Sequence, residues 1–169
     1  MKKLLLLFVL TTLLVTGCSI QNNSKNTDFG GIIEARDGII YDFGDIDINS
    51  GTVSRSFNFT NNDTKPLAIY EATTSCGCTT GTVTVQGQAF GPFGMHNQTQ
   101  EIIEVPAGGF FTVTINYDPL FHGPTDLGKR QRTLFLFSSA SADGEIVREY
   151  KGKPNFTEIS VVGNVVSNE

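Results

Sequence analysis

Two cysteines separated by one glycine, Cys76-Gly77-Cys78, have the side chains of this 169-residue chain that are best suited to chemistry. Their spacing allows three states. In the first state the thiols are reduced and buried at a tight turn. In the second they form a disulfide within a small ring, and in the third they bind a soft metal such as Cu(I), which prefers thiolate ligands. Gly77 permits unusual backbone angles in each state. Cys76 and Cys78 are thus a candidate disulfide or thiol site, and no cofactor is expected unless they bind Cu(I).

Other residues with metal-binding or catalytic chemistry form no complete site in the sequence. His96 and His122 lie in loops, where solvent exposure is the simplest interpretation. Together with Met95 they complete a metal site only if the loops converge. The repeat Asp45-x-Asp47-x-Asn49 resembles the start of a calcium loop, but the intervening isoleucines indicate a strand edge. The nucleophile-elbow, phosphate-loop and His-Glu-x-x-His motifs are absent from the sequence, so we expect a protein that is not an enzyme.

The N-terminus predicts export. A basic pair, Lys2-Lys3, precedes an apolar run from Leu4 to Val15, which has the length of a signal-peptide core and is too short to span a bilayer. The run ends in Val15-Thr16-Gly17-Cys18, which resembles the lipobox of bacterial lipoproteins. The resemblance implies a signal peptide over residues 1–17 and a lipid, such as diacylglycerol and palmitate, on Cys18. A signal peptide with an unrelated cysteine is the alternative.

This resemblance also implies a location and a partner. The lipid on Cys18 is expected to hold the chain in the bacterial cell envelope, with its domain outside the cytoplasm. Ser19, in place of aspartate, favours the outer membrane in a diderm bacterium, and the plasma membrane is expected otherwise. Loss of Lys2 and Lys3 changes the formal charge from −5 to −7, which disfavours nucleic acid as a partner. Beyond the membrane, we expect an envelope protein or polymer.

The remaining chain divides into a tether and one domain. Residues 18–37 are rich in Asn, Ser, Lys, Thr and Gly without periodicity, which predicts a flexible tether. Residues 38–169 contain short segments with alternating polar and apolar side chains, separated by turn signals. The clearest of these strands are 52–60, 67–74, 110–117, 132–137 and 156–166.

This pattern predicts an all-β fold, an Ig-like antiparallel β-sandwich of seven to nine strands. Residues 132–137 are apolar on both faces, which indicates a covered central strand. Gly163 indicates a bulge or a close approach, Asp143-Gly144 a hairpin turn, and residues 86–97 a long loop or irregular hairpin. The chain has no tryptophan, and Cys76 and Cys78 are too close to bridge two sheets, so the likeness to immunoglobulin domains concerns architecture alone.

Several segments together resemble the bacterial domain-of-unknown-function family numbered fifteen seventy-three (DUF1573). They are Tyr41-Asp42-Phe43-Gly44, Phe57-Asn58-Phe59-Thr60-Asn61, Pro66-Leu67-Ala68-Ile69, Ser75-Cys76-Gly77-Cys78-Thr79, Val105-Pro106-Ala107-Gly108, Val113-Thr114-Ile115-Asn116-Tyr117-Asp118 and Ile159-Ser160-Val161-Val162-Gly163. The resemblance covers roughly residues 39 to 165 and implies an exported, often lipid-anchored Ig-like domain without an established reaction. The segment between Cys78 and Pro106 is longer than is usual in this family, because of residues 86–100.

The sequence therefore predicts a lipid-anchored, non-catalytic binding or structural module of the bacterial cell envelope. The alternative is a thiol-redox or copper-handling envelope protein that uses Cys76 and Cys78.

Overall fold

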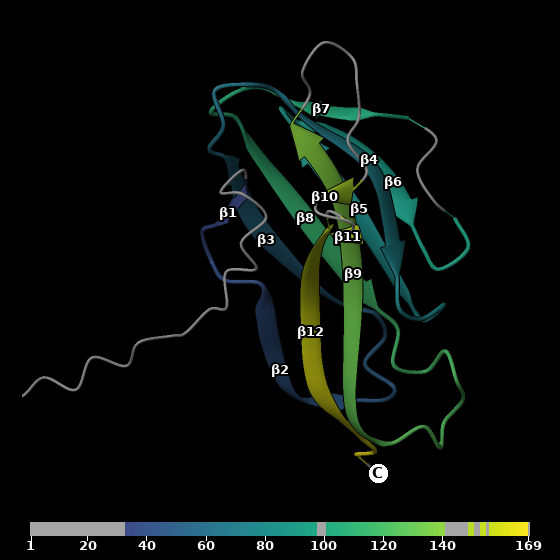
Figure 1. The fold of residues 1–169 in the computed structure, drawn as a ribbon. Helices are drawn as coiled ribbons and strands as arrows, with labels where there is room; N and C mark the ends of the chain where they lie inside the picture. Colours follow the sequence, from purple (N-terminus) through teal and green to yellow (C-terminus); the bar gives the residue numbers. More distant parts are fainter. Residues whose placement is uncertain (1–32, 98–100, 141–148, 151–152, 155, 169) are drawn as a thin grey trace, which may run out of the picture.

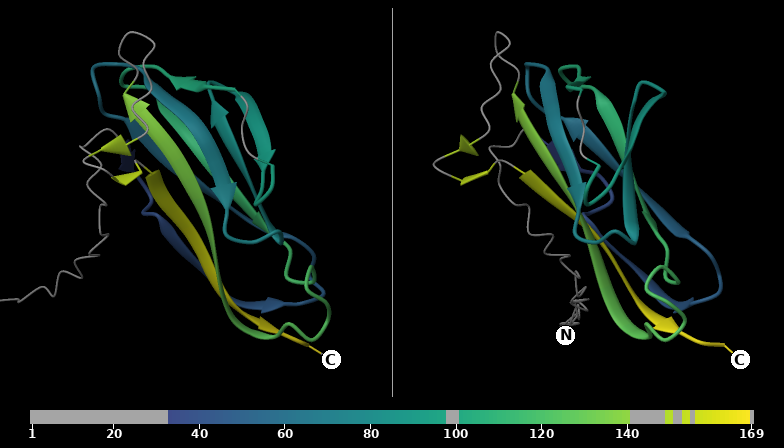
Figure 2. Two further views of the ribbon diagram at one scale, coloured as in Figure 1. Left: turned by 45° about the vertical axis from the view of Figure 1, so that its right-hand side comes forward. Right: turned by 90° about the vertical axis from the view of Figure 1, so that its right-hand side faces the viewer.

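The computed structural model describes residues 33–97, 101–140, 149–150, 153–154 and 156–168. These residues form twelve β-strands and no helix (Figure 1). In this part of the chain, accordingly, no helix is long and apolar enough to cross a membrane. Two five-stranded sheets face each other, as the side views in Figure 2 show, so the predicted all-β, Ig-like sandwich is confirmed.

The first sheet is antiparallel throughout. Its strands lie in the order β1 (Ile33–Ala35), β3 (Val53–Asn61), β8 (Phe110–Tyr117), β5 (Thr79–Val85) and β6 (Gln88–Phe93). Because β5 pairs with β8, residues that follow Tyr117 lie beside residues that precede Thr79. This register places the cysteine turn next to the loop after β8.

The second sheet has the order β2 (Ile40–Asp47), β12 (Phe156–Val166), β9 (Gly128–Ala140), β4 (Leu67–Thr74) and β7 (Ile103–Val105). Its pairs are antiparallel except β12 with β2, which is parallel. The sequence predicts an antiparallel sandwich, and this pair differs because β2 and β12 are distant in the chain and no hairpin fixes their direction. A separate ladder joins β10 (Glu149–Tyr150) and β11 (Lys153–Pro154).

Alternate side chains of the strands fill the space between the sheets. In β3 and β8, Phe57, Phe59, Phe111, Val113 and Ile115 are buried, while the residues between them lie outside. Phe59 and Phe111 are directly opposite in the register, and their rings stack with centroids 5.1 Å apart. Burying each such side chain contributes about 1.5–3 kcal/mol, so the alternation itself is the main stabilising pattern.

The sequence also predicts the central strand and the irregularity at Gly163, and both are confirmed. β9 is the third of five strands, with Leu134 and Leu136 fully buried. On its other face, Phe135 and Phe137 are half-buried against Phe156, at 5.8 and 5.3 Å between centroids. At Gly163 the register of β12 with β2 shifts, and a Cβ atom there would lie 2.5 Å from a side-chain carbon of Ile46.

Four details refine the sequence prediction, differ from it or lie beyond the described residues. Residues 33–35, expected within the tether, form β1 and pair with β3; residues 1–32 are outside the described part of the chain. Of the long loop or irregular hairpin predicted over residues 86–97, the hairpin is what forms: residues 88–93 are strand β6, which pairs with β5 with a register shift between Gly81 and Val83. Eight of the twelve strands have six or more residues, within the expected range of seven to nine. The hairpin turn at residues 142–145 lies outside the described residues.

Candidate functional site

The cysteine pair occupies the turn between β4 and β5, at the lower right of the ribbon in Figure 1. The structure joins Cys76 and Cys78 in a disulfide, with their Cα atoms 5.2 Å apart. The buried Thr74 hydroxyl contacts the carbonyl oxygens of Cys76 and Thr79, each at 3.0 Å, and the Thr79 amide donates to the Cys76 carbonyl at 3.1 Å. These contacts fix the turn at the point where two core strands meet.

The two sulfurs differ in their access to solvent. Cys78 is only 4% exposed and belongs to the core, whereas Cys76 is half-buried. Since attack on a disulfide needs access to a sulfur, the exposed partner is the one that a second molecule reaches first. The pair therefore has an outer and an inner sulfur.

Gly77 has a different role from the one expected of it. Its backbone is not among those with positive φ in the described chain, so it does not need the angles that favour glycine. Instead, a Cβ atom at this position would lie 3.4 Å from the ring of Phe121, in the loop between β8 and β9. A contact of that length is ordinary, so Gly77 marks the point where the loop packs against the cysteine turn.

His122, the next residue of this loop, reaches the outer sulfur. Its Nε2 atom lies 3.1 Å from Cys76 Sγ, within the range of a hydrogen bond to sulfur. The imidazole is exposed, and the ring of Phe121 packs against it edge to face at 5.1 Å. Of the two loop histidines, His122 therefore joins the cysteines; His96 is exposed in the turn after β6 and is not part of this group of donor atoms.

Arg132 contacts the inner sulfur from β9, in the opposite sheet. Its Nε–H donates to Cys78 Sγ at 2.9 Å, and its guanidinium lies over the ring of Tyr117, 5.1 Å from the centroid. Burial raises the pKa of Tyr117, and the positive charge of Arg132 opposes this increase. The tyrosine therefore stays neutral and supplies a flat, uncharged surface below the guanidinium.

The loop that carries His122 is held at both ends. At its start, the Asp118 amide donates to the Cys78 carbonyl at 3.0 Å, which follows from the pairing of β5 with β8. At its end, Asp126 pairs with Arg130, whose guanidinium also donates to the Leu127 carbonyl at 2.9 Å. The hydrogen bond from Arg130 holds the pKa of Asp126 below its ordinary value, so the pair stays charged at neutral pH. The imidazole is thus presented by a short, tethered loop.

Three ligand atoms of this site are close enough to share one ion. The sulfurs of Cys76 and Cys78 and a ring nitrogen of His122 all lie within 4.8 Å of one another. The sequence identifies both cysteines and treats His122 as one of two equivalent loop histidines. Arg132 and Phe121 carry no sequence signal for this site, because their contacts depend on how the two sheets and the two loops meet.

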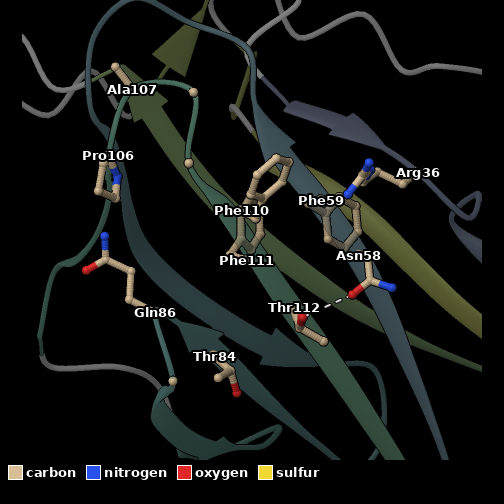
Figure 3. Close-up of a pocket in the computed structure, with 13 residues that line it drawn as sticks. Arg36, Asn58, Phe59, Thr84, Gln86, Pro106, Ala107, Phe110, Phe111 and Thr112 are labelled. Atoms are coloured by element: carbon tan, nitrogen blue, oxygen red, sulfur yellow. Dashed lines mark hydrogen bonds between the residues drawn. The ribbon is translucent and has the colours of Figure 1, made fainter.

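A second feature is an open groove of about 550 Å³ on the first sheet (Figure 3). It lies over Asn58 and Phe59 of β3 and Phe110 to Thr112 of β8, and the turn 106–109 closes one side. Phe110 is 61% exposed, and the Arg36 guanidinium lies 5.0 Å from the centre of its ring. Arg36 is the one ionisable residue among those that line the groove, so the lining suits contact with a ligand better than acid–base chemistry.

Sequence comparison gives a match to one family model over part of the chain. The model described as a protein of unknown function, DUF1573, matches residues 33–92, which extend from β1 to β6 and include the cysteine turn. No curated protein matches the chain.

Comparison with solved structures gives likeness of fold alone, because identities are low. A protein of unknown function from Porphyromonas gingivalis W83 is 14% identical with a TM-score of 0.52; the match covers 80% of this chain and 47% of that chain, so this chain spans about half its length. The ASH/PapD-like domain 7 of human CEP192 is 10% identical with a TM-score of 0.46, covering 99% and 100%. WR4, an MSP family member from C. elegans, is 14% identical with a TM-score of 0.41, covering 80% and 99%.

Proposed function

We propose that this chain, which matches the DUF1573 model over residues 33–92, is a lipid-anchored, non-catalytic binding module of the bacterial cell envelope. The sandwich presents the groove beside Phe110, and the lipid on Cys18 keeps that groove at a membrane surface. The observation that carries the binding role is Phe110 itself. A large aromatic side chain that is 61% exposed, with a guanidinium over its ring, is typical of a contact surface.

The anchor rests on the sequence before Cys18. An apolar leader that ends in Val-Thr-Gly-Cys provides the acylation signal, and a single acyl group gives weak, reversible attachment unless further chains are added. Metabolic labelling with radioactive palmitate in a bacterial host tests this. We expect the full chain to be labelled and membrane-bound, and Cys18→Ala to lose both properties.

Cys76→Ala is the matched control for the anchor, because it removes a cysteine from the domain and leaves the leader intact. It should keep its label and its membrane fraction. Equal labelling of the Cys18→Ala protein would contradict a lipid on Cys18.

The groove is tested by photo-crosslinking in intact cells. A photoreactive residue in place of Phe110 should give a discrete adduct with one envelope component. The matched position is Ile40, which is 63% exposed on β2 in the other sheet and lies outside the groove. Adducts of the same pattern from both positions would argue against a specific contact at the groove, and measurable turnover of any envelope substrate would argue against a non-catalytic role.

A second candidate function, thiol–disulfide exchange, is favoured by the asymmetry of the disulfide. The thiolate of an external dithiol attacks Cys76 Sγ; the bond between the sulfurs breaks, and Cys78 leaves as a thiolate. Arg132 Nε–H, 2.9 Å from that sulfur, stabilises its negative charge. The second thiol of the dithiol then attacks the mixed disulfide, so that the dithiol is oxidised and the protein gains two electrons and two protons.

The rate of reduction by dithiothreitol tests this candidate. The disulfide of Arg132→Met should be reduced at least about tenfold more slowly than that of the parent, since losing one hydrogen bond to a charged atom costs at least about 1.5 kcal/mol. Lys129→Met, three positions away in the same strand, removes an exposed cation outside the site, and as the control it should react at the parent rate. If both variants react like the parent, Arg132 does not assist the leaving sulfur.

A further inference from the structure

We propose that the reduced form of this domain contains a Cu(I) site formed by Cys76 Sγ, Cys78 Sγ and His122 Nε2. This inference goes beyond the envelope binding role and does not depend on it. The donor atoms come from two loops that are far apart in sequence, yet all of them lie within 4.8 Å of one another. In the oxidised form the two sulfurs bond to each other, so metal binding and the disulfide exclude each other.

The distances suit a single ion with three ligands. Bonds of about 2.3 Å to sulfur and about 2.0 Å to nitrogen, arranged in a plane, place the ligand atoms roughly 4 Å apart. His122 Nε2 is 3.1 Å from Cys76 Sγ, so a small movement of an exposed side chain reaches this spacing. The sulfurs separate once their bond is reduced, and the 5.2 Å between the Cα atoms leaves room for side-chain rotation.

The ligand types favour Cu(I) over Zn(II). Thiolate is a soft ligand that selects Cu(I), whereas structural zinc sites use four protein ligands. No fourth His, Cys, Asp or Glu joins this group among the residues that the structure describes. Two thiolates and one Cu(I) carry a net charge of −1. The positive guanidinium of Arg132, which donates a hydrogen bond to Cys78 Sγ at 2.9 Å, offsets this charge. Such outer hydrogen bonds to a ligand atom tune both affinity and orientation.

Loading the site requires a reductant of the dithiol class. The dithiol transfers two electrons and two protons to the disulfide and becomes a disulfide itself. Cu(I) then displaces one proton from each thiol, and its oxidation state does not change. The imidazole binds as the neutral ring through Nε2, so it releases no proton when it is already neutral.

The experiment uses the full chain with Cys18→Ala, so that Cys76 and Cys78 supply the only thiols. The protein is reduced with dithiothreitol, freed of it without oxygen, and titrated with Cu(I) in competition with bicinchoninate. We expect one Cu(I) per chain, and X-ray absorption should show two sulfur ligands and one nitrogen ligand. His122→Gln should weaken binding by at least about tenfold, and the protein left oxidised should bind none.

His96→Gln is the matched control, because His96 is also an exposed loop histidine but lies outside the cluster; its affinity should equal that of the parent. Thermal unfolding of each variant verifies that it is folded. The proposal is overturned if the reduced chain binds no Cu(I), if His122→Gln binds as tightly as His96→Gln, or if Zn(II) displaces Cu(I) at equal concentration. Since purified protein is used, failure here leaves the envelope binding role untouched.

Discussion

Asn61 should be the most sensitive polar residue of the sandwich. Its side chain is completely buried at the end of β3. The amide nitrogen donates to the carbonyl oxygens of Lys65, Val105 and Pro106 at 3.0, 3.2 and 3.0 Å, and its oxygen accepts from the Asp63 amide at 3.1 Å. One side chain thus connects its own turn to the turn that closes the groove.

Asn61→Ala removes these four hydrogen bonds, of which the one to the Val105 carbonyl is fully buried, whereas the Pro106 carbonyl keeps the Gly109 amide as a donor. With about 1 kcal/mol for each of three net hydrogen bonds, the free energy of unfolding should fall by about 3 kcal/mol. Asn61→Asp should cost more at neutral pH, because it places a carboxylate against three carbonyl oxygens with no donor to offer. A loss of about 3 kcal/mol or more is a large part of the free energy of unfolding, which is usually about 5–15 kcal/mol for a domain.

Urea unfolding of the full chain with Cys18→Ala, followed by circular dichroism, measures the effect. The chain has no tryptophan, so backbone ellipticity is a better probe than fluorescence. Asn58→Ala is the control, because Asn58 is an exposed residue of the same strand that bonds Asp37 and Thr112 at the surface. It should cost less than about 1 kcal/mol. If Asn61→Ala costs no more than Asn58→Ala, the bonds of Asn61 do not stabilise the fold and the reasoning fails.

Three further substitutions test the packing and the electrostatics. Gly81→Ala should destabilise the protein by about 1–3 kcal/mol in urea unfolding, because its Cβ would overlap the side chain of Leu134 across the core, whereas Gly77→Ala, at the exposed turn, should cost much less. Gly163→Val should cost a similar 1–3 kcal/mol in the same assay, since even a Cβ there lies 2.5 Å from a side-chain carbon and 3.2 Å from a carbonyl oxygen. Burial raises the pKa of Tyr117 above its ordinary 10.0, so the unfolded chain loses this proton at a lower pH than the folded chain. The contribution of protonated Tyr117 to the free energy of unfolding is therefore present below about pH 10 and lost as the pH rises through the folded pKa. The free energy of unfolding should therefore decline less steeply above pH 10 in Tyr117→Phe than in the parent, as measured by urea unfolding at several pH values.

The sandwich was predictable because its strands alternate. In β8, and in β3 from Phe57 onward, every second residue is buried, and a period of two that recurs between turn signals indicates a strand with one buried face. The central position of β9 was predictable for a related reason, since a strand that is apolar on both faces needs cover on both, and a central strand is better covered than an edge strand. β1, of three residues, and β11, of two, carry too few residues to show a period.

The parallel pairing of β2 with β12 was not predictable in the same way. Period two describes which face a residue occupies and is silent about strand direction. Direction follows from the connection when two strands form a hairpin, but these two strands are the second and the last among the described strands. The shift of register at Gly163 is the part of this pair that the sequence does indicate, because glycine is the residue that tolerates the contact with Ile46.

The candidate site shows the same limit at the level of single residues. Cys76 and Cys78 can be recognised as a pair from the sequence because they are two positions apart. His122 and Arg132 lie 46 and 54 positions away from the sulfurs that they contact, so the sequence does not connect them to the pair. One fact of register accounts for the first of these contacts: β5 pairs with β8 so that Thr79 opposes Tyr117, and the residues just outside this pair, Cys78 and Asp118, must then be neighbours. The alternation of β8 fits other partners equally well, so its sequence does not select β5. Once that pairing is known, the position of His122 follows. It lies four residues after Asp118, in a loop held by a hydrogen bond at its start and an ion pair at its end, and these restraints keep it next to the cysteine turn.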